Sequence, residues 1–401
     1  MDWSLLKQEM LDWRKAFTLR GCLVPFFLGF VPSFWDVYTD YEYADEWSGN
    51  LTKGHCLVSL TIRSGQTRTG YPYLFICLPA LTLIFVALSR QAQGFVDRTC
   101  CKCYKGCFCS LIKEVLKCST ALALFLGVFL AATDCSGDLK YLSYPCAASL
   151  LGLKLMTVFV QGPTMKKIGL MATSHEATYE AGLQMFFVLA TTFFQDHTPD
   201  MTTTTHSLLS SLLTITKAAV EAQLTFAIND KMTEQPFVTK IIQIVKLGPV
   251  FAFTTFHRIT GLAVLFYCLS TYVVPTYVQC SHICSHVVLF GVLLLLPLIV
   301  LVLCKICYLK DILLSELVMG VFGEMFTITI WGKRGREKSR ALQLIFFFSY
   351  FTLYTFLFLY VLIDDPVLET TTYFRGLYIA GLTSGLLSLP LFVVQVYNMQ
   401  C

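Results

Sequence analysis

Long apolar stretches alternate with short polar segments along the whole sequence. Each stretch is close to the roughly 20 residues that a helix needs to cross a bilayer. The stretches lie near 19–43, 71–90, 110–133, 146–163, 167–195, 207–229, 248–274, 285–309, 313–332, 341–363 and 375–398. Two are irregular, because 146–163 carries Lys154 and 313–332 carries two glutamates and several glycines. We expect these two to be half-inserted or re-entrant, which is tolerated only where protein or a wet cavity surrounds the backbone.

The composition supports a membrane protein. Of the 401 residues, 55% are hydrophobic and 14% are charged, whereas soluble proteins carry about 25% charged residues. The N-terminal segment 1–18 carries charges of both signs and lacks the pattern of a cleavable signal peptide. The sequence therefore predicts an all-α, polytopic helical bundle that forms one multi-pass domain over 1–401. Its net charge of +4 is too small to indicate a nucleic-acid partner.

Basic residues concentrate in two loops and predict the orientation. One is the cysteine-rich loop 91–109 with its flanks, and the other is the loop 333–340, which holds five basic residues and one acid. By the positive-inside rule both loops are cytoplasmic. The number of membrane crossings then agrees with two cytoplasmic termini if 313–332 is re-entrant. The opposite loops, at 134–144, 195–206 and 364–372, are poor in Lys and Arg. Asn50-Leu51-Thr52, a glycosylation sequon, then lies outside.

Two carboxylates and an amide interrupt one apolar segment. Glu176, Glu180 and Gln184 are spaced i, i+4, i+8, which places them on one helix face. A carboxylate in hydrocarbon costs several kcal/mol. We therefore expect these side chains to form a polar site with partners inside the bundle.

Other predicted spans carry charges as well. They are Asp36 and Asp40, Lys217 and Glu221, and Arg258. Asp36 and Asp40 either share a helix face in the first span or lie past its outer end. Lys217 could neutralise Glu221 or the acids of the central span, and Arg258 is a candidate counter-ion for one carboxylate. For all of these charges, structural ion pairs between helices and a transport role remain open alternatives.

No motif of a phosphate loop, a metalloprotease or a nucleophile elbow occurs in the sequence. His175, next to Glu176, is expected to be a packed helix histidine rather than a metal ligand. We expect no enzyme activity, no metal and no cofactor.

The 17 cysteines divide between the two sides of the predicted membrane. The cytoplasmic cluster next to the membrane consists of Cys100, Cys101, Cys103, Cys107 and Cys109. Its basic setting favours palmitoylation, while a zinc site and unmodified thiols are the alternatives. Among the cysteines predicted to lie outside, Cys135 and Cys146 close a short loop and are our first choice for a disulfide.

Taken in order, these residues resemble the XK-related family of membrane proteins, which includes phospholipid scramblases. The resemblance covers roughly residues 15–398. The matching runs are Asp36-Val37-Tyr38-Thr39-Asp40; Glu176, Glu180 and Gln184; Ser211-Leu212-Leu213 with Ala218 and Glu221; Arg258-Ile259-Thr260-Gly261-Leu262-Ala263-Val264; and Gly332-Lys333-Arg334-Gly335-Arg336. The sequence departs from the family pattern at two places. Leu183 stands where the family has proline. In some relatives a basic residue follows the acid that corresponds to Glu221, whereas here Lys217 precedes this acid.

The resemblance implies about eight transmembrane helices plus two half-inserted helices in the plasma membrane. It also implies ATP-independent movement of phospholipids, phosphatidylserine among them, along a charged intramembrane path. That path would use Asp36, Asp40, Glu176, Glu180, Gln184, Lys217, Glu221 and Arg258, with Lys154 as a lesser candidate. Apoptotic members carry a caspase-type site in a C-terminal tail. The sequence has no Asp-x-x-Asp and ends soon after the last predicted helix, so we expect no activation by tail cleavage.

Two other functions remain open at this point. The chain could be a non-scrambling scaffold for a single-span chaperone or a lipid-transfer protein, with the two cytoplasmic loops as docking surfaces. It could also be a small-solute transporter or an ion channel that uses the same charged core.

Overall fold

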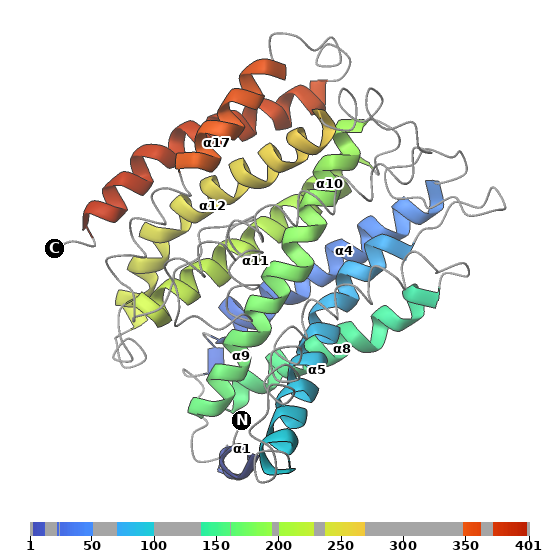
Figure 1. The fold of residues 1–401 in the computed structure, drawn as a ribbon, viewed down its shortest axis with the longest axis vertical. Helices are drawn as coiled ribbons and strands as arrows, with labels where there is room; N and C mark the ends of the chain where they lie inside the picture. The colour runs from blue at the N-terminus through green and yellow to red at the C-terminus, as the bar shows by residue number, and fades with distance from the viewer. Residues whose placement is uncertain are drawn as a thin grey trace.

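The computed structural model describes residues 3–12, 22–23, 25–50, 70–99, 138–160, 162–194, 200–227, 237–268, 348–361 and 372–398. The regular elements in these ranges are all helical (Figure 1). They are α1 (Trp3–Leu11), η1 (Phe26–Phe30), α4 (Val31–Asn50), α5 (Gly70–Thr99), α8 (Asp138–Phe159), α9 (Pro163–Glu176), η2 (Ala177–Ala181), α10 (Gly182–Phe194), α11 (Met201–Ala227), α12 (Phe237–Cys268), the helix Phe348–Val361 and α17 (Thr372–Asn398). The predicted all-α class is confirmed for this part of the chain.

A continuous helical rod runs through the middle of the bundle. It consists of α9, η2 and α10, and every residue from 181 to 190 is buried. α5, α11 and α12 all pack against the rod. α17 covers α12, and α8 covers α5, so these two helices form opposite faces of the bundle (Figure 1).

Apolar side chains cover the outside of the bundle. Four described helices contain segments long and apolar enough to cross a membrane: Pro72–Gln93, Leu139–Phe159, Val245–Cys268 and Arg375–Val394. On α17, Leu386 and Val394 are 55% and 56% exposed, whereas Asp36 and Glu180 in the interior are fully buried. An apolar exterior around buried charge is what a bilayer favours, because lipid solvates apolar side chains and leaves charges without partners.

The irregular segment at 146–163 is not a half-helix, so that prediction was wrong. α8 begins at Asp138, eight residues earlier than predicted, and runs for 22 residues to Phe159. Lys154 does not interrupt it, because its side chain points into the bundle and meets a carboxylate there. The other irregular segment, 313–332, lies outside the described residues, as do 110–133, 285–309 and the basic loop 333–340.

Both ends of the described chain lie at the same end of the bundle. α1 and the last turn of α17 are found there, together with the end of α5 and the beginning of α9 (Figure 1). α5 continues to Thr99, so the predicted cysteine-rich loop 91–109 begins as helix. Which side of the membrane this end faces stays a prediction from the loop charges.

α1 packs against the beginning of α9 through a carboxylate cap. α9 starts at Pro163, whose missing N–H is no loss in the first turn of a helix. The next two backbone N–H groups, of Thr164 and Met165, donate to the carboxylate of Glu9 at 3.0 and 3.1 Å. Partial burial raises the pKa of Glu9, but these hydrogen bonds outweigh it and hold the pKa below the usual 4.5.

α12 and α17 approach each other closely at two glycines. A Cβ atom on Gly385 would lie 2.4 Å from Nδ1 of His257, and one on Gly381 would lie 2.7 Å from the Thr260 methyl carbon. The same His257 nitrogen is 3.0 Å from the Gly381 carbonyl oxygen. Small residues four apart let helix backbones approach within a membrane, where van der Waals packing drives association.

Candidate functional site

Six polar side chains from three parts of the bundle converge in its interior, and we call them the polar cluster. They are Asp36 and Asp40 on α4, Lys154 on α8, and Glu176, Glu180 and Gln184 on the central rod. Lys154 is 4% exposed and the other five are completely buried. Asp36 and Asp40 are therefore buried inside the bundle.

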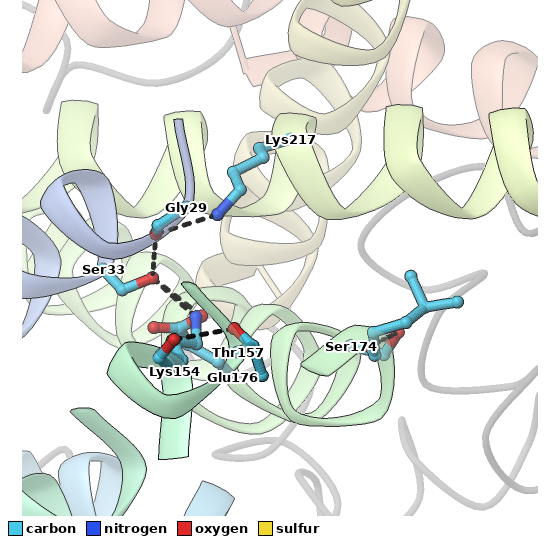
Figure 2. A network of polar contacts seen from close by, with 8 residues as sticks. Gly29, Ser33, Lys154, Thr157, Ser174, Glu176 and Lys217 are labelled. Carbon is cyan, nitrogen blue, oxygen red and sulfur yellow. Dashed lines mark hydrogen bonds and ion pairs between the residues drawn. The ribbon is translucent and has the colours of Figure 1, made fainter. Parts of the chain in front are cut away.

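Lys154 forms an ion pair with Glu176 at one end of the cluster (Figure 2). The ammonium group also donates a hydrogen bond to the hydroxyl of Ser33, with Nζ and Oγ 2.5 Å apart. Ser33 in turn lies 3.1 Å from the carbonyl oxygen of Gly29, to which it donates. Lys217 reaches the same carbonyl from α11, at 3.1 Å. This network ties α4, α8, α11 and the central rod together around one buried ammonium group.

Two π-helical turns lie at the network. In η1 the N–H of Val31 bonds to the carbonyl of Phe26, and in η2 the N–H of Gly182 bonds to that of Ala177. A π-turn inserts an extra residue and shifts the direction of the side chains that follow it. The Gly29 carbonyl within η1 accepts the two side-chain hydrogen bonds described above. Such π-bulges are frequent at functional sites, and the sequence did not predict either one.

η2 changes the predicted geometry of the central acids. Glu176 ends the preceding α-helix, and Glu180 lies within η2 itself. Their spacing therefore spans a π-turn rather than one α-helical turn. Glu176 meets Lys154, while Glu180 interacts electrostatically with Asp36 and Asp40. Glu176 is thus held in an ion pair with Lys154, while Glu180 groups with Asp36 and Asp40 in what we call the acidic end of the cluster, which also interacts electrostatically with Lys154.

The acidic end of the cluster has unused hydrogen-bonding capacity. Among the residues that the structure describes, both carboxylate oxygens of Glu180 lack a hydrogen-bond partner, whereas Asp36 faces three hydroxyl groups of α11. Oδ2 of Asp40 and the Gln184 amide also lack a partner in the described part of the chain, while Oδ1 of Asp40 accepts from Ser207 at 3.1 Å. Buried carboxylates are normally paired or hydrogen-bonded, because each otherwise keeps a desolvation penalty of several kcal/mol.

Hydroxyl groups of α11 line the acidic end. Ser210, Ser211 and Thr214 interact with Asp36, and Ser210 also hydrogen-bonds Thr39 at 2.7 Å. Ser207, Ser210 and Ser211 are all at most 2% exposed. A hydroxyl is both donor and acceptor, so this wall can serve an anionic, a cationic or a neutral polar group.

The structure also describes the three remaining predicted charges, Lys217, Glu221 and Arg258. Lys217 and Glu221 are half-buried on α11, and both interact electrostatically with Lys154. Arg258 is 2% exposed, and its guanidinium lies 5.0 Å from the centre of the Tyr350 ring. Its assignment as a counter-ion for a carboxylate of the cluster stays a prediction.

His175 packs as predicted. Its Nδ1 lies 2.8 Å from the Thr82 hydroxyl, and its ring meets Tyr179 edge-on at 5.4 Å. Within the described ranges, no group of three or more His, Cys, Asp or Glu side chains could hold a metal ion.

The prediction of a Cys135–Cys146 disulfide was wrong, because Cys146 is free. Cys146 is a free, buried thiol within α8, because that helix starts earlier than expected and carries this cysteine into the bundle. Cys135 and the five candidate palmitoylation cysteines lie outside the described residues. Asn50 is the last residue of α4, and its side chain and the rest of the sequon are not described.

Sequence reasoning underestimated Lys154 and missed Ser33. Lys154 was a lesser candidate because its segment looked irregular, yet it is the ammonium group of the central network. A lysine inside a long apolar segment was itself the signal. Ser33 carries no such signal, since a serine in an apolar helix usually bonds its own backbone.

A scan against protein-family models finds none that matches this chain, and no curated protein matches its sequence.

Proposed function

We propose that this chain is a multi-pass membrane protein of the XK-related type that moves phospholipids between leaflets without ATP. Phosphatidylserine at the plasma membrane is the expected cargo. The proposal includes about eight spans with both termini in the cytoplasm. The observation that supports it best is the polar cluster, in which Glu180 is completely buried and neither of its carboxylate oxygens has a hydrogen-bond partner among the described residues.

A lipid head group carries the charges that complement this cluster. Phosphatidylserine and phosphatidylethanolamine have an ammonium group and a phosphate. The acidic end, with Asp36, Asp40 and Glu180, offers sites for the ammonium group. Lys154 and Lys217 lie at the other end and can attract the phosphate. Such partners reduce the cost of carrying a charged head group through hydrocarbon, which otherwise sets the barrier.

The unused hydrogen-bonding capacity favours weak, transient binding. A path for many lipids needs several sites that bind well enough to admit each head group but release it again. A carboxylate already locked in an ion pair, such as Glu176, exchanges partners at a high cost. Glu180 holds no such partner among the described residues and is therefore the better candidate for direct contact. Because the cluster is fully buried, head groups reach it only when the surrounding helices separate.

Transfer of small cations is the second candidate function. Three acids converge at one end of the cluster, and this arrangement also suits a cation that crosses without a lipid. The two functions differ in what moves, so they can be separated in vesicles.

The test is a flipping assay in reconstituted vesicles that contain a fluorescent phospholipid. We expect the wild-type protein to flip lipid faster than protein-free vesicles, and Glu180→Gln to slow flipping about tenfold, or about 1.4 kcal/mol of barrier. The matched control is Glu42→Gln on α4, because Glu42 bonds Tyr38 on the exposed side of the helix. Wild-type flipping no faster than in empty vesicles would refute the proposal. Ion current without lipid movement would support the second candidate.

A further inference from the structure

Two free cysteines face each other across the interface between α5 and α8. Cys77 lies seven residues after the beginning of α5, and Cys146 lies eight residues after the beginning of α8. The two side chains lie together in the interface where α5 packs against α8, and their thiols interact with each other. Cys77 is completely buried and Cys146 is 8% exposed. Together with Ala80 they form a small apolar cluster of their own, against which Leu81 packs.

We propose that Cys77 and Cys146 are a disulfide-forming pair that links α5 to α8 when hydrogen peroxide oxidises it. The two cysteines already share one small buried cluster between two packed helices, so no helix has to move far. The oxidant must be small because the site is buried, and peroxide is uncharged and about the size of a water molecule. The inference is independent of the proposed lipid movement.

Cys146 is the thiol that reacts first. It is the more exposed of the two, so peroxide reaches it more easily. Its sulfur attacks one oxygen of the peroxide, so that an S–O bond forms and the O–O bond breaks. The leaving hydroxide takes the thiol proton and departs as water, and Cys146 becomes a sulfenic acid.

Cys77 then resolves the sulfenic acid. Its sulfur attacks the sulfur of Cys146, so that the S–S bond forms and the S–O bond breaks. The leaving hydroxide takes the Cys77 proton as a second water. In total, two thiols lose two electrons and two protons, and one peroxide is reduced to two waters.

The position of the pair gives such a crosslink a structural effect. Cys77 interacts electrostatically with Glu180, and Tyr41 of α4 interacts with both. α5 also packs against η2, which carries Glu180. A disulfide here therefore joins two neighbouring helices directly beside the acidic end of the polar cluster.

The test is peroxide treatment of the full-length protein in lipid nanodiscs. Free thiols are then blocked with a maleimide, and the protein is digested without reductant for mass spectrometry. We expect a peptide pair joined through Cys77 and Cys146, lighter by two hydrogens than the reduced pair and separated by reductant. Cys268, a buried thiol on α12, reports whether peroxide attacks buried cysteines in general. We expect Cys268 to stay reduced and therefore to react with maleimide after unfolding.

Two results would overturn the proposal. One is that Cys77 and Cys146 both remain reactive to maleimide after unfolding, at peroxide levels that oxidise other thiols of the chain. The other is that Cys146 pairs with a different cysteine, Cys135 included. The wild-type protein alone decides between these outcomes, so the test does not depend on the folding of a variant. Cys146→Ser adds a check, since it should abolish the crosslinked peptide and leave Cys77 reactive.

Discussion

Removal of the Lys154 ammonium group is the sharpest test of the central network. Lys154→Met keeps the length of the side chain but leaves Glu176 without its ion-pair partner. Glu176 is completely buried, and Oε1 has no hydrogen-bond partner among the described residues. Oε2 would keep only the long contact with Ser33, at 3.4 Å. Breaking a buried pair in this way costs about 3–5 kcal/mol, because one charge stays buried and unpaired.

The same helix offers a matched control. Lys140, also on α8, pairs with Asp45 at 2.7 Å, but the two side chains are 37% and 52% exposed. Solvent screens such a pair, so Lys140→Met should cost at most about 1 kcal/mol. The measurement is the thermal unfolding midpoint of purified protein in detergent. We expect Lys154→Met to lower the midpoint several times more than Lys140→Met.

A double variant separates the ion pair from simple loss of packing. Glu176→Gln removes the orphaned charge, so Lys154→Met combined with Glu176→Gln should recover most of the lost stability. Equal losses for the two lysine variants would refute the reasoning. So would a double variant whose loss equals the sum of the single losses, because the two charges would then not be coupled.

Two further predictions concern other contacts. Gly385→Ala should destabilise the protein by about 1–3 kcal/mol in thermal unfolding, because the new Cβ would lie 2.4 Å from the His257 ring. The control is Gly376→Ala on the same helix, where the new Cβ has no atom within 4 Å and the change should be neutral or stabilising. Glu9→Gln should weaken the docking of α1 by about 0.5–1 kcal/mol, measured as faster amide hydrogen exchange in α1. Because folding lowers the pKa of Glu9, its carboxylate stabilises the protein fully above the usual pKa of 4.5, and this stabilisation is lost as the pH falls through the lowered value. Amide hydrogen exchange in α1 should therefore be the same for wild type and Glu9→Gln in acid and should differ at neutral pH. A pH-independent difference would contradict this assignment.

Hydrophobic length and charge placement predicted much of the helical architecture. The ranges predicted near 167–195 and 375–398 match Pro163–Phe194 and α17 within a few residues. These segments are long runs of apolar residues, and such a run specifies a helix almost regardless of its neighbours. The prediction failed at 146–163, where Lys154 indicated an irregular segment. The lysine is accommodated inside a regular α8, because the surrounding helices supply it with partners.

The members of the candidate site followed from sequence, but their pairing did not. Asp36, Asp40, Glu176, Glu180 and Gln184 were all predicted, since a polar side chain in an apolar helix is costly enough to indicate a role.

The sequence by itself determined that the chain is apolar, helical and interrupted by a few buried charges, because each of these properties depends on local composition. Only the tertiary structure decided which charges meet. Lys154 and Glu176 are on different helices, and two π-turns set the directions of the Gly29 carbonyl and of the Glu180 side chain. It likewise placed Cys146 together with Cys77 in one buried cluster. Contacts between helices depend on their rotation and depth, and no local pattern in the sequence encodes these.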